Sequence, residues 1–404
     1  MKTVLLARQP IFDIHQKTYA YELLYRGDAM NIGDDAMTAT VLCNTLNQFG
    51  MDAITDGSPF FINLSKEFLL SDFPNLLPTE SVVLEVLEDV PADDDVIAAM
   101  QHWKEKGFTI ALDDFVSMNS EHIKLLPYTD IVKVDILEYE GKLDEIVHEL
   151  RQTKVKLLAE KVETHEQHEL CKELGFDYYQ GYFFSQPSLM VEHHSLDTNK
   201  AQLLQLLSRT LEAESPKELE NDIAHDLALS YKLLCYINSA SVGLRKEIHS
   251  IGHALNLMGL NNIRTWVSML LMASLSKDKP DALLSLSFTR GRFLELLAIS
   301  LGEPKKANDY FILGMFSLLD ALLDQDIADA TESISLPDLV HDGLLNKESN
   351  EANKLELIRA LEQADWPRLS ELLQLIGIDD EQMSSLYSES VQWADERMSL
   401  ISSM

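Results

Sequence analysis

Seven short apolar runs lie in the first half of the chain, and acidic or amide residues break or close most of them. The runs are residues 3–10, 60–65, 81–88, 108–115, 131–136, 155–163 and 178–185. An apolar run that stops abruptly at Asn, Glu or Asp-Asp indicates a buried strand whose C-terminal end carries polar side chains into a shared site. In a parallel barrel these strand ends converge on one face, where the chemistry takes place.

Stretches with helical periodicity separate several of the runs, for example residues 91–106 and 139–153. Alternation of strand and helix over the first 190 residues predicts an α/β fold, a TIM-like (β/α) barrel. A doubly wound open sheet would give the same alternation. The barrel is favoured because polar residues end nearly every strand, whereas an open sheet gathers its site at one switch point.

The alternating pattern stops near Pro187, and a short polar segment follows. Beyond it the apolar residues keep a helical period, at residues 201–211, 218–237, 251–275 and 290–301. We therefore expect a barrel domain at residues 1–190, a linker at 191–200 and an all-helical domain at 201–404.

The formal net charge of −33 excludes some partners. A chain this acidic repels nucleic acid and anionic membranes, so we expect no direct nucleic-acid binding. An anionic ligand would need divalent cations and a few Arg or Lys residues at its site. The chain has three cysteines without a CxxC pair, which predicts reduced thiols. With no signal peptide and no apolar run near ~18 residues, we expect a cytoplasmic protein without membrane insertion.

The strand ends predict one cluster of polar side chains, formed by Glu22, Asn63, Glu85, Glu88, Asp113, Asp114, Glu160 and Glu163, with Lys133 and Gln180 beside them. Carboxylates gathered at one barrel mouth repel one another unless cations bind. Oxygen ligands suit Mg²⁺ or Mn²⁺, and two such ions can activate water for phosphoryl displacement. Lys133 could hold that water, and Arg26 could pair with a phosphate oxygen. The predicted reaction is metal-dependent hydrolysis of a phosphodiester.

Each of these residues also has an ordinary structural explanation. Glu22 could be an acidic residue at a helix or strand edge, and Asp113-Asp114 could cap a helix. Lys133 and Asp135 could form a buried ion pair, and Glu160 and Glu163 could be solvated acids at a helix start. Only the joint occurrence of these residues at successive strand ends favours a site.

The first half of the chain resembles the EAL domain, the phosphodiesterase module for the bacterial second messenger cyclic di-GMP. The motifs that carry the resemblance are RQPI (8–11), ELLYR (22–26), INLS (62–65), LEVLE (84–88), DDF (113–115), KVD (133–135), AEKVET (159–164) and QGYFFSQP (180–187). The resemblance implies a Mg²⁺ or Mn²⁺ site with two metal ions, and hydrolysis of cyclic di-GMP to linear pGpG.

The resemblance also implies a role for each motif residue. The metal ligands would be Glu22, Asn63, Glu85 and Asp113, with Asp114 near the second ion. Lys133 would position water, and Glu160 would act as general base or metal contact. Glu22, Lys133 and Glu160 would form the catalytic group. The nucleotide would be contacted by Gln9, Leu24, Arg26, Gln180 and Pro187, and Glu88 would anchor the loop after Asp-Asp-Phe.

Three departures from the EAL pattern stand out. Active members follow Asp-Asp-Phe with a glycine-rich loop, but residues 116–121 read VSMNSE, without the glycine that favours positive φ. Lys161 stands where the family has glycine, which adds a cation to the rim of the site. The segment between Glu22 and Asn63 is shorter than usual and lacks one family stretch.

The second half resembles the all-helical HDOD domain, at residues 230–240, 247–266 and 310–323. The whole chain is similar to EAL–HDOD proteins of the YuxH/CdgJ type, which implies bacterial signalling, with motility or biofilm control as output. His249 and His253 have a spacing that can bind metal, but helix-surface or core histidines explain them. The resemblance implies a regulatory domain with an unknown protein partner.

Three functions stay open at this point. The chain could be a cyclic di-GMP phosphodiesterase regulated through HDOD, a catalytically silent cyclic di-GMP sensor, or a protein-interaction scaffold with a degenerate EAL domain. The retained acids favour the enzyme, and the altered loop favours the sensor. A homodimer is also left open by the changed loop.

Overall fold

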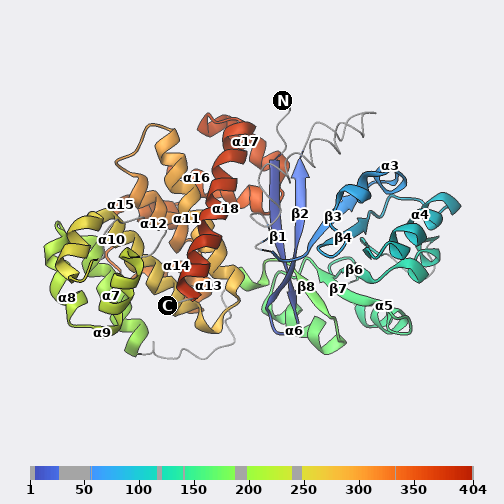
Figure 1. Ribbon diagram of the computed structural model, residues 1–404, viewed down its shortest axis with the longest axis horizontal. Helices are drawn as coiled ribbons and strands as arrows, with labels where there is room; N and C mark the ends of the chain where they lie inside the picture. The colour runs from blue at the N-terminus through green and yellow to red at the C-terminus, as the bar shows by residue number, and fades with distance from the viewer. Residues whose placement is uncertain are drawn as a thin grey trace. The chain divides into compact units, whose positions relative to one another are not determined.

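The computed structural model describes residues 5–26, 55, 57–115, 121–139, 142–186, 198–238, 248–332 and 334–402 (Figure 1). The chain forms two compact units. One contains residues 1–186 and 359–388, and the other contains residues 187–358 and 389–404. The unit that includes the N-terminal half therefore also takes in a segment from near the C-terminus.

A closed barrel of eight strands dominates the first unit, with the strands in chain order around the barrel. The strands are β1 (Leu5–Asp13), β2 (Thr18–Arg26), β3 (Phe60–Leu64), β4 (Val82–Val86), β5 (Thr109–Leu112), β6 (Ile131–Asp135), β7 (Lys156–Glu160) and β8 (Tyr178–Gln180). The predicted TIM-like barrel is thus confirmed, and closure excludes the open sheet.

The first strand departs from a purely parallel barrel. Strands β2 to β8 pair in parallel with their neighbours, but β1 is antiparallel to both β2 and β8. Only residues 14–17 separate β1 from β2, and a parallel connection needs about a dozen residues or more. The Asp13 carboxylate closes this turn by accepting hydrogen bonds from the backbone amides of His15 (2.8 Å) and Lys17 (3.0 Å). The seven apolar runs missed β2, because Glu22 and Arg26 interrupt its apolar pattern.

One layer of apolar side chains fills the inside of the barrel. Every strand contributes one buried residue to it: Ile11, Ala20, Phe61, Val83, Ala111, Ile131, Leu158 and Tyr178. Side chains alternate between the two faces of a strand, so the next inward position on each strand lies two residues further on. The functional cluster is built at those positions.

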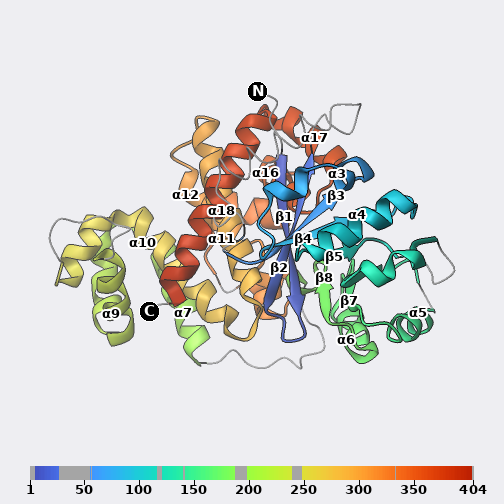
Figure 2. The ribbon, with the colours of Figure 1, turned by 45° about the vertical axis from the view of Figure 1, so that its right-hand side comes forward.

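Helices cover the outside of the barrel in both views (Figures 1 and 2). They are α3 (Lys66–Leu70), α4 (Asp94–Glu105), α5 (Leu143–Leu150) and α6 (His165–Leu174). Short 3₁₀ turns complete the connections at Phe73–Leu76, Glu121–Lys124, Leu126–Tyr128 and Phe183–Ser185. Thr164 and Gln167 form a capping box that starts α6 directly after the β7 site residues.

From residue 198 onward the described chain contains helices and no strand, which confirms the predicted all-helical part. Its helices are α7 (Thr198–Glu212), α8 (Glu220–Ala224), α9 (Leu227–Ile237), α10 (Ile251–Leu275), α11 (Asp281–Ser300), α12 (Ala307–Phe316), α13 (Leu319–Leu323), α14 (Ile327–Glu332), α15 (Asp338–Leu345), α16 (Asn350–Glu362), α17 (Trp366–Ile376) and α18 (Asp380–Ser402), with 3₁₀ turns at Pro216–Leu219 and Ser276–Asp278. The longest apolar helix, α10, is kinked at Gly259 (φ +73°).

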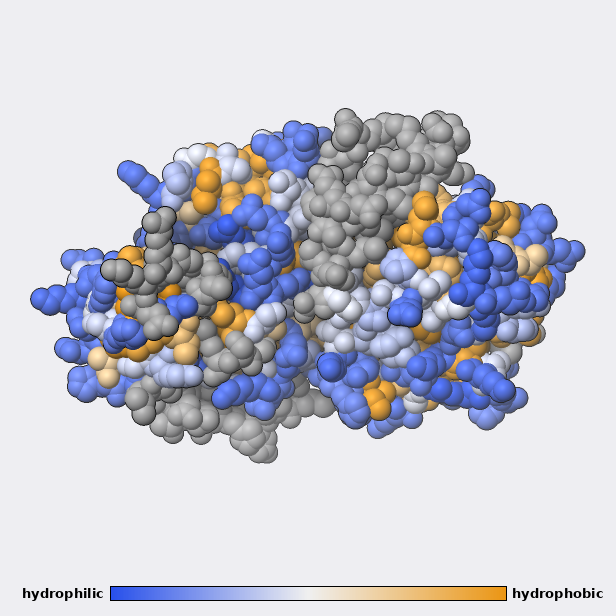
Figure 3. All heavy atoms as spheres, viewed as in Figure 1, coloured by the Kyte–Doolittle hydropathy of each residue, from blue (hydrophilic) through white to orange (hydrophobic). Residues whose placement is uncertain are grey.

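Hydrophilic residues cover most of the described surface on the face shown in Figure 3. Across the described ranges, every helix is too short or too polar to cross a bilayer.

Candidate active site at the barrel mouth

The candidate site is a second inward-facing layer of the barrel, directly above the apolar layer. Each strand supplies it with the residue two positions from its apolar layer residue: Gln9, Glu22, Asn63, Glu85, Asp113, Lys133, Glu160 and Gln180. On β1 the step runs backwards, from Ile11 to Gln9, because this strand is antiparallel. Because every second side chain of a strand faces inward, residues that lie far apart in the sequence form one polar ring.

Lys133 lies at the centre of this ring and is 1% exposed. Its ammonium nitrogen is 3.4 Å from Glu22 Oε2, 3.0 Å from Asp113 Oδ1 and 2.7 Å from Glu160 Oε1, and it also pairs with Glu85. Four carboxylates thus face one ammonium group. When all four are ionised, three negative charges stay uncompensated, which is costly in a buried site unless another cation enters.

Three amide side chains orient the ring. The Asn63 amide nitrogen donates to Glu22 Oε1 (3.3 Å), and Gln180 Nε2 donates to Glu22 Oε2 (2.6 Å) and to Gln9 Oε1 (3.2 Å). The amide nitrogens of Asn63 and Gln180 donate to Glu22 and Gln9. The side-chain oxygens of Asn63 and Gln180 can therefore accept a ligand. The amide geometry therefore adds oxygen ligands to the carboxylates.

Several buried oxygens of the ring have no hydrogen-bond partner among the described residues. They are Asn63 Oδ1, Glu85 Oε2, Glu160 Oε2 and Gln180 Oε1. A buried polar atom without a hydrogen-bond partner normally lowers the stability of the fold by about 1–3 kcal/mol. A bound cation would satisfy the four oxygens of this ring. Oxygen donors of this kind fit a hard dication such as Mg²⁺ or Mn²⁺, so the ring passes this test for the implied metal.

Burial and mutual repulsion shift the protonation of the ring. Burial, together with neighbouring carboxylates, raises the pKa of Glu85 well above its ordinary value and that of Glu160 to about 8, although Lys133 lowers both. Burial opposes the charge of Lys133, but the surrounding carboxylates outweigh it and raise the lysine pKa well above its ordinary value. Burial likewise opposes ionisation of Asp113, but the charge of Lys133 outweighs it and lowers the pKa of Asp113.

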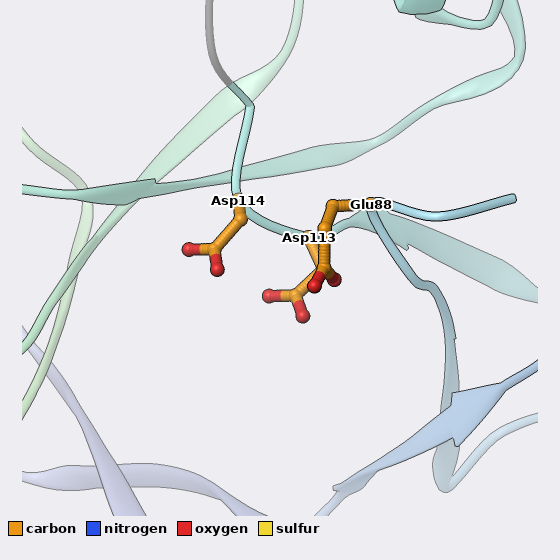
Figure 4. A group of neighbouring side chains, drawn as sticks. All are labelled: Glu88, Asp113 and Asp114. Carbon is orange, nitrogen blue, oxygen red and sulfur yellow. The ribbon is translucent and has the colours of Figure 1, made fainter. Parts of the chain in front are cut away.

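The Asp113-Asp114-Phe115 turn is fixed by its two neighbouring strands. The Asp113 amide donates to Val86 O (2.9 Å) and the Phe115 amide to Lys133 O (3.1 Å). Asp114 has a positive φ of 37°. The carboxylates of Glu88, Asp113 and Asp114 gather in one place, with one oxygen of each within 4.8 Å of the others (Figure 4). A helix capped by the Asp pair would begin within residues 116–120, which lie outside the described residues.

A second ion pair lies above the ring, at a residue that the sequence motifs did not single out as a site. Asp135 follows Lys133 by two positions on β6, and its side chain is 4% exposed. It pairs with Lys161, not with Lys133. The step of two residues along β6 could have placed Asp135 in the site. Glu163, by contrast, is exposed and its amide bonds Gln167 near the start of α6 (2.7 Å), as its ordinary explanation predicts.

Gln9 has a partner that no sequence pattern could indicate. Its amide nitrogen donates to the backbone oxygen of Glu362 (3.0 Å), at the end of α16, and the Tyr182 hydroxyl donates to the same oxygen. Leu24 on β2 is half-buried. Pro187, the side chain of Arg26 and loop residues 116–120 lie outside the described residues.

Comparison with known proteins agrees with both halves of this structure. The EAL domain model matches residues 2–187, and the HDOD domain model matches residues 198–359. The standalone versatile EAL protein of Vibrio cholerae O395, solved in its cyclic di-GMP-bound form, is 22% identical over 46% of this chain and 93% of that chain, with a TM-score of 0.36.

Two relatives match over nearly the full length. YuxH of Bacillus subtilis (strain 168), an uncharacterized protein, is 33% identical over 98% of this chain and 99% of its own length. The cyclic di-GMP phosphodiesterase CdgJ of Vibrio cholerae (El Tor Inaba N16961) is 32% identical over 99% of this chain and 94% of its own length. The chain therefore belongs to the family of proteins in which an EAL domain is followed by an HDOD domain.

Proposed function

We propose that this chain is a metal-dependent phosphodiesterase that hydrolyses cyclic di-GMP to pGpG and is regulated through its helical domain. The observation that carries the proposal is the ring of buried oxygens around Lys133, four of which lack a hydrogen-bond partner among the described residues. The similarity to CdgJ, a cyclic di-GMP phosphodiesterase, supports the choice of substrate.

Mg²⁺ or Mn²⁺ would be held by Glu22, Asn63, Glu85 and Asp113, with Asp114 at the position that the EAL pattern gives to a second ion. When bound, a dication supplies charge neutralisation for the phosphodiester and a more acidic water. Gln180 and Asn63 hold Glu22 in place by donating to both of its oxygens (2.6 and 3.3 Å). Such positioning contacts to ligand carboxylates typically change metal affinity 10–100-fold.

Glu160 would carry out the proton transfer, and Lys133 would position the attacking water. The oxygen of the attacking water bonds to phosphorus while the bond from phosphorus to one ribose oxygen breaks. Glu160 would take the proton of the water, since a carboxyl group with a pKa near 8 is an effective base at neutral to alkaline pH. Lys133, 2.7 Å from Glu160, would hold the water in line. The departing ribose oxygen takes up a proton from solvent and ends as a hydroxyl, which completes pGpG.

The nucleotide would be contacted by Gln9, Leu24, Arg26, Gln180 and Pro187. To contact a guanine edge, the Gln9 amide nitrogen would exchange the hydrogen bond that it donates to the Glu362 carbonyl oxygen (3.0 Å) for one to the base. Glu88 would anchor the loop after Asp-Asp-Phe through the turn at Asp113 and Asp114.

Turnover of cyclic di-GMP by the full chain with Mn²⁺ tests the proposal. We expect pGpG to form, and Glu22→Ala or Glu160→Ala to slow its formation by about 100-fold or more. Glu173→Ala is the matched control, because Glu173 is exposed on α6 and loses the same charge. Equal rates for Glu160→Ala and Glu173→Ala would refute the catalytic role.

A silent sensor is the second candidate, and the ion pair between Lys161 and Asp135 favours it. This pair places a fixed positive charge beside the ring, where active EAL domains have a glycine. Calorimetry with cyclic di-GMP and Ca²⁺ would detect binding without turnover. Binding together with no pGpG under Mn²⁺ would select the sensor, and Arg26→Ala should then weaken binding.

A further inference from the structure

Lys161 adopts a backbone conformation that its side chain disfavours. Its φ is +55°, in the left-handed region that residues with a Cβ atom disfavour. The residue directly follows Glu160, the last residue of β7. Strain of this kind persists when the surroundings hold it, and it gathers at functional sites. The question is what the lysine side chain does there.

The ammonium group of Lys161 forms an ion pair with the buried carboxylate of Asp135. It pairs with Asp135 Oδ2, while the other oxygen, Oδ1, accepts from the Leu137 amide (2.9 Å). Asp135 and Glu160 lie opposite each other in the β6–β7 pairing, so the lysine reaches over the edge of the site from the neighbouring strand. An unpaired carboxylate that is only 4% exposed would be costly, so the pair is more than a surface contact.

Two further carboxylates lie within the electrostatic reach of Lys161. The hydrogen bond with Asp135 raises the pKa of Lys161, and the charges of Asp114 and Glu160 add to this rise. Burial and Asp113 raise the pKa of Asp114, whereas Lys161 lowers it. The ion pairs themselves divide the acidic residues between two lysines: Lys133 pairs with four carboxylates inside the ring, and Lys161 pairs with Asp135 at its edge.

We propose that Lys161 acts as a tethered cation in place of a second metal ion, so that this chain binds one dication in its barrel. The inference rests on the proposed metal site but makes a claim of its own about stoichiometry. The side chain is 55% exposed and therefore compatible with a position at the rim of an open site. Its charge neutralises Asp135, which lies opposite Glu160 in the β6–β7 pairing, so a second dication beside Asp113 would find one free carboxylate fewer at this edge of the site.

Counting bound Mn²⁺ on the full chain tests the inference without any assay of activity. Equilibrium dialysis should give one Mn²⁺ for the parent chain and for Lys161→Arg. It should give two for Lys161→Gln and Lys161→Gly, and the spin resonance spectrum should broaden because ions about 4 Å apart couple. Lys161→Gly also removes the backbone strain, so it should fold. Lys172→Gln is the matched control, since Lys172 is 52% exposed on α6, and it should keep one ion.

The outcomes separate this inference from the proposed function. Two ions on the parent chain, or one ion on both Lys161→Gln and Lys161→Gly, would overturn the tethered-cation role and leave metal dependence standing. No Mn²⁺ on the parent chain or on any variant would overturn the proposed function, and the inference with it.

Discussion

At the scale of single residues, the site depends on carboxyl groups whose burial disfavours their charged form. Glu85 is fully buried and Glu160 is 9% exposed, and both face the same ammonium group. One lysine cannot neutralise four carboxylates, so part of the ring holds protons until a dication replaces them. Metal binding to the ring should therefore release protons.

The pH dependence of stability follows from Glu160. Burial raises its pKa from 4.5 to about 8, so between these values the folded state holds a proton that the unfolded state has lost. This contribution to the free energy of unfolding is complete below pH 4.5 and disappears as pH rises through 8. Glu160→Gln cannot ionise and should not show this loss.

Urea unfolding of metal-free protein at pH 5 and pH 8 measures the effect. The stability of Glu160→Gln relative to the parent should rise by on the order of 3–4 kcal/mol between the two pH values. Glu173→Gln, which removes an exposed carboxylate of α6, should show no such rise. Parallel pH profiles for Glu160→Gln and the parent would contradict the raised pKa.

At the scale of elements, the barrel strands carry function on their last inward-facing positions. The apolar layer ends at one residue of each strand, and the polar ring begins two residues later. At β8 the chain must then turn sharply, and Gly181 makes this possible with a φ of +142°. A Cβ there would come within 2.1 Å of Val162 O, whose backbone pairs with both Gln180 and Phe183.

We predict that Gly181→Ala destabilises the barrel by at least about 2 kcal/mol, because both the conformation and the space exclude a side chain. Gly175→Ala is the control: Gly175 also has a positive φ, of +89°, but its nearest neighbour is a flexible Arg151 atom at 3.7 Å. The control should cost about 1 kcal/mol. Equal losses in urea unfolding would show that the contact with Val162 is not decisive.

The sequence predicts elements well where the pattern is local. The runs at residues 60–65 and 131–136 contain strands β3 and β6, and helix α10 has the predicted limits, Ile251–Leu275. Strand β2 was missed because its inward Glu22 breaks the apolar pattern. The same feature that makes Glu22 a site candidate therefore hides the strand that carries it.

The rest of the site depends on contacts that no local pattern encodes. The pair of Lys161 with Asp135 joins two strands, and the bond from Gln9 to Glu362 joins residues 353 positions apart. The alternative of a Lys133–Asp135 pair was plausible from spacing alone, but the two side chains lie in successive layers. The pairing register of the barrel strands decides which carboxylates lie beside each lysine.

At the scale of the whole molecule, chain order and compact units do not coincide. The unit that contains the barrel includes residues 359–388, which follow the end of the HDOD match at residue 359. Within this unit the Glu362 carbonyl accepts hydrogen bonds from Gln9 and Tyr182. The barrel unit therefore includes a segment that lies far along the chain from its last strand.

We predict that a fragment of residues 1–190 is less stable than the barrel in the full chain, because it lacks residues 359–388. The loss should appear as a lower midpoint of thermal unfolding, followed by a probe such as Trp103, which is buried in the barrel unit. Adding residues 359–388 to the fragment through a flexible linker should recover most of the difference. A fragment as stable as the full chain would contradict this role for the segment.

The central claim is that oxygens of the ring around Lys133 bind a hard dication. Anomalous diffraction from crystals of the full chain grown with Mn²⁺ measures this directly. The account predicts one manganese peak, bounded by Glu22, Asn63, Glu85 and Asp113. No peak in the barrel, or a peak held only by Glu88 and Asp114 away from Glu22 and Asn63, would contradict it.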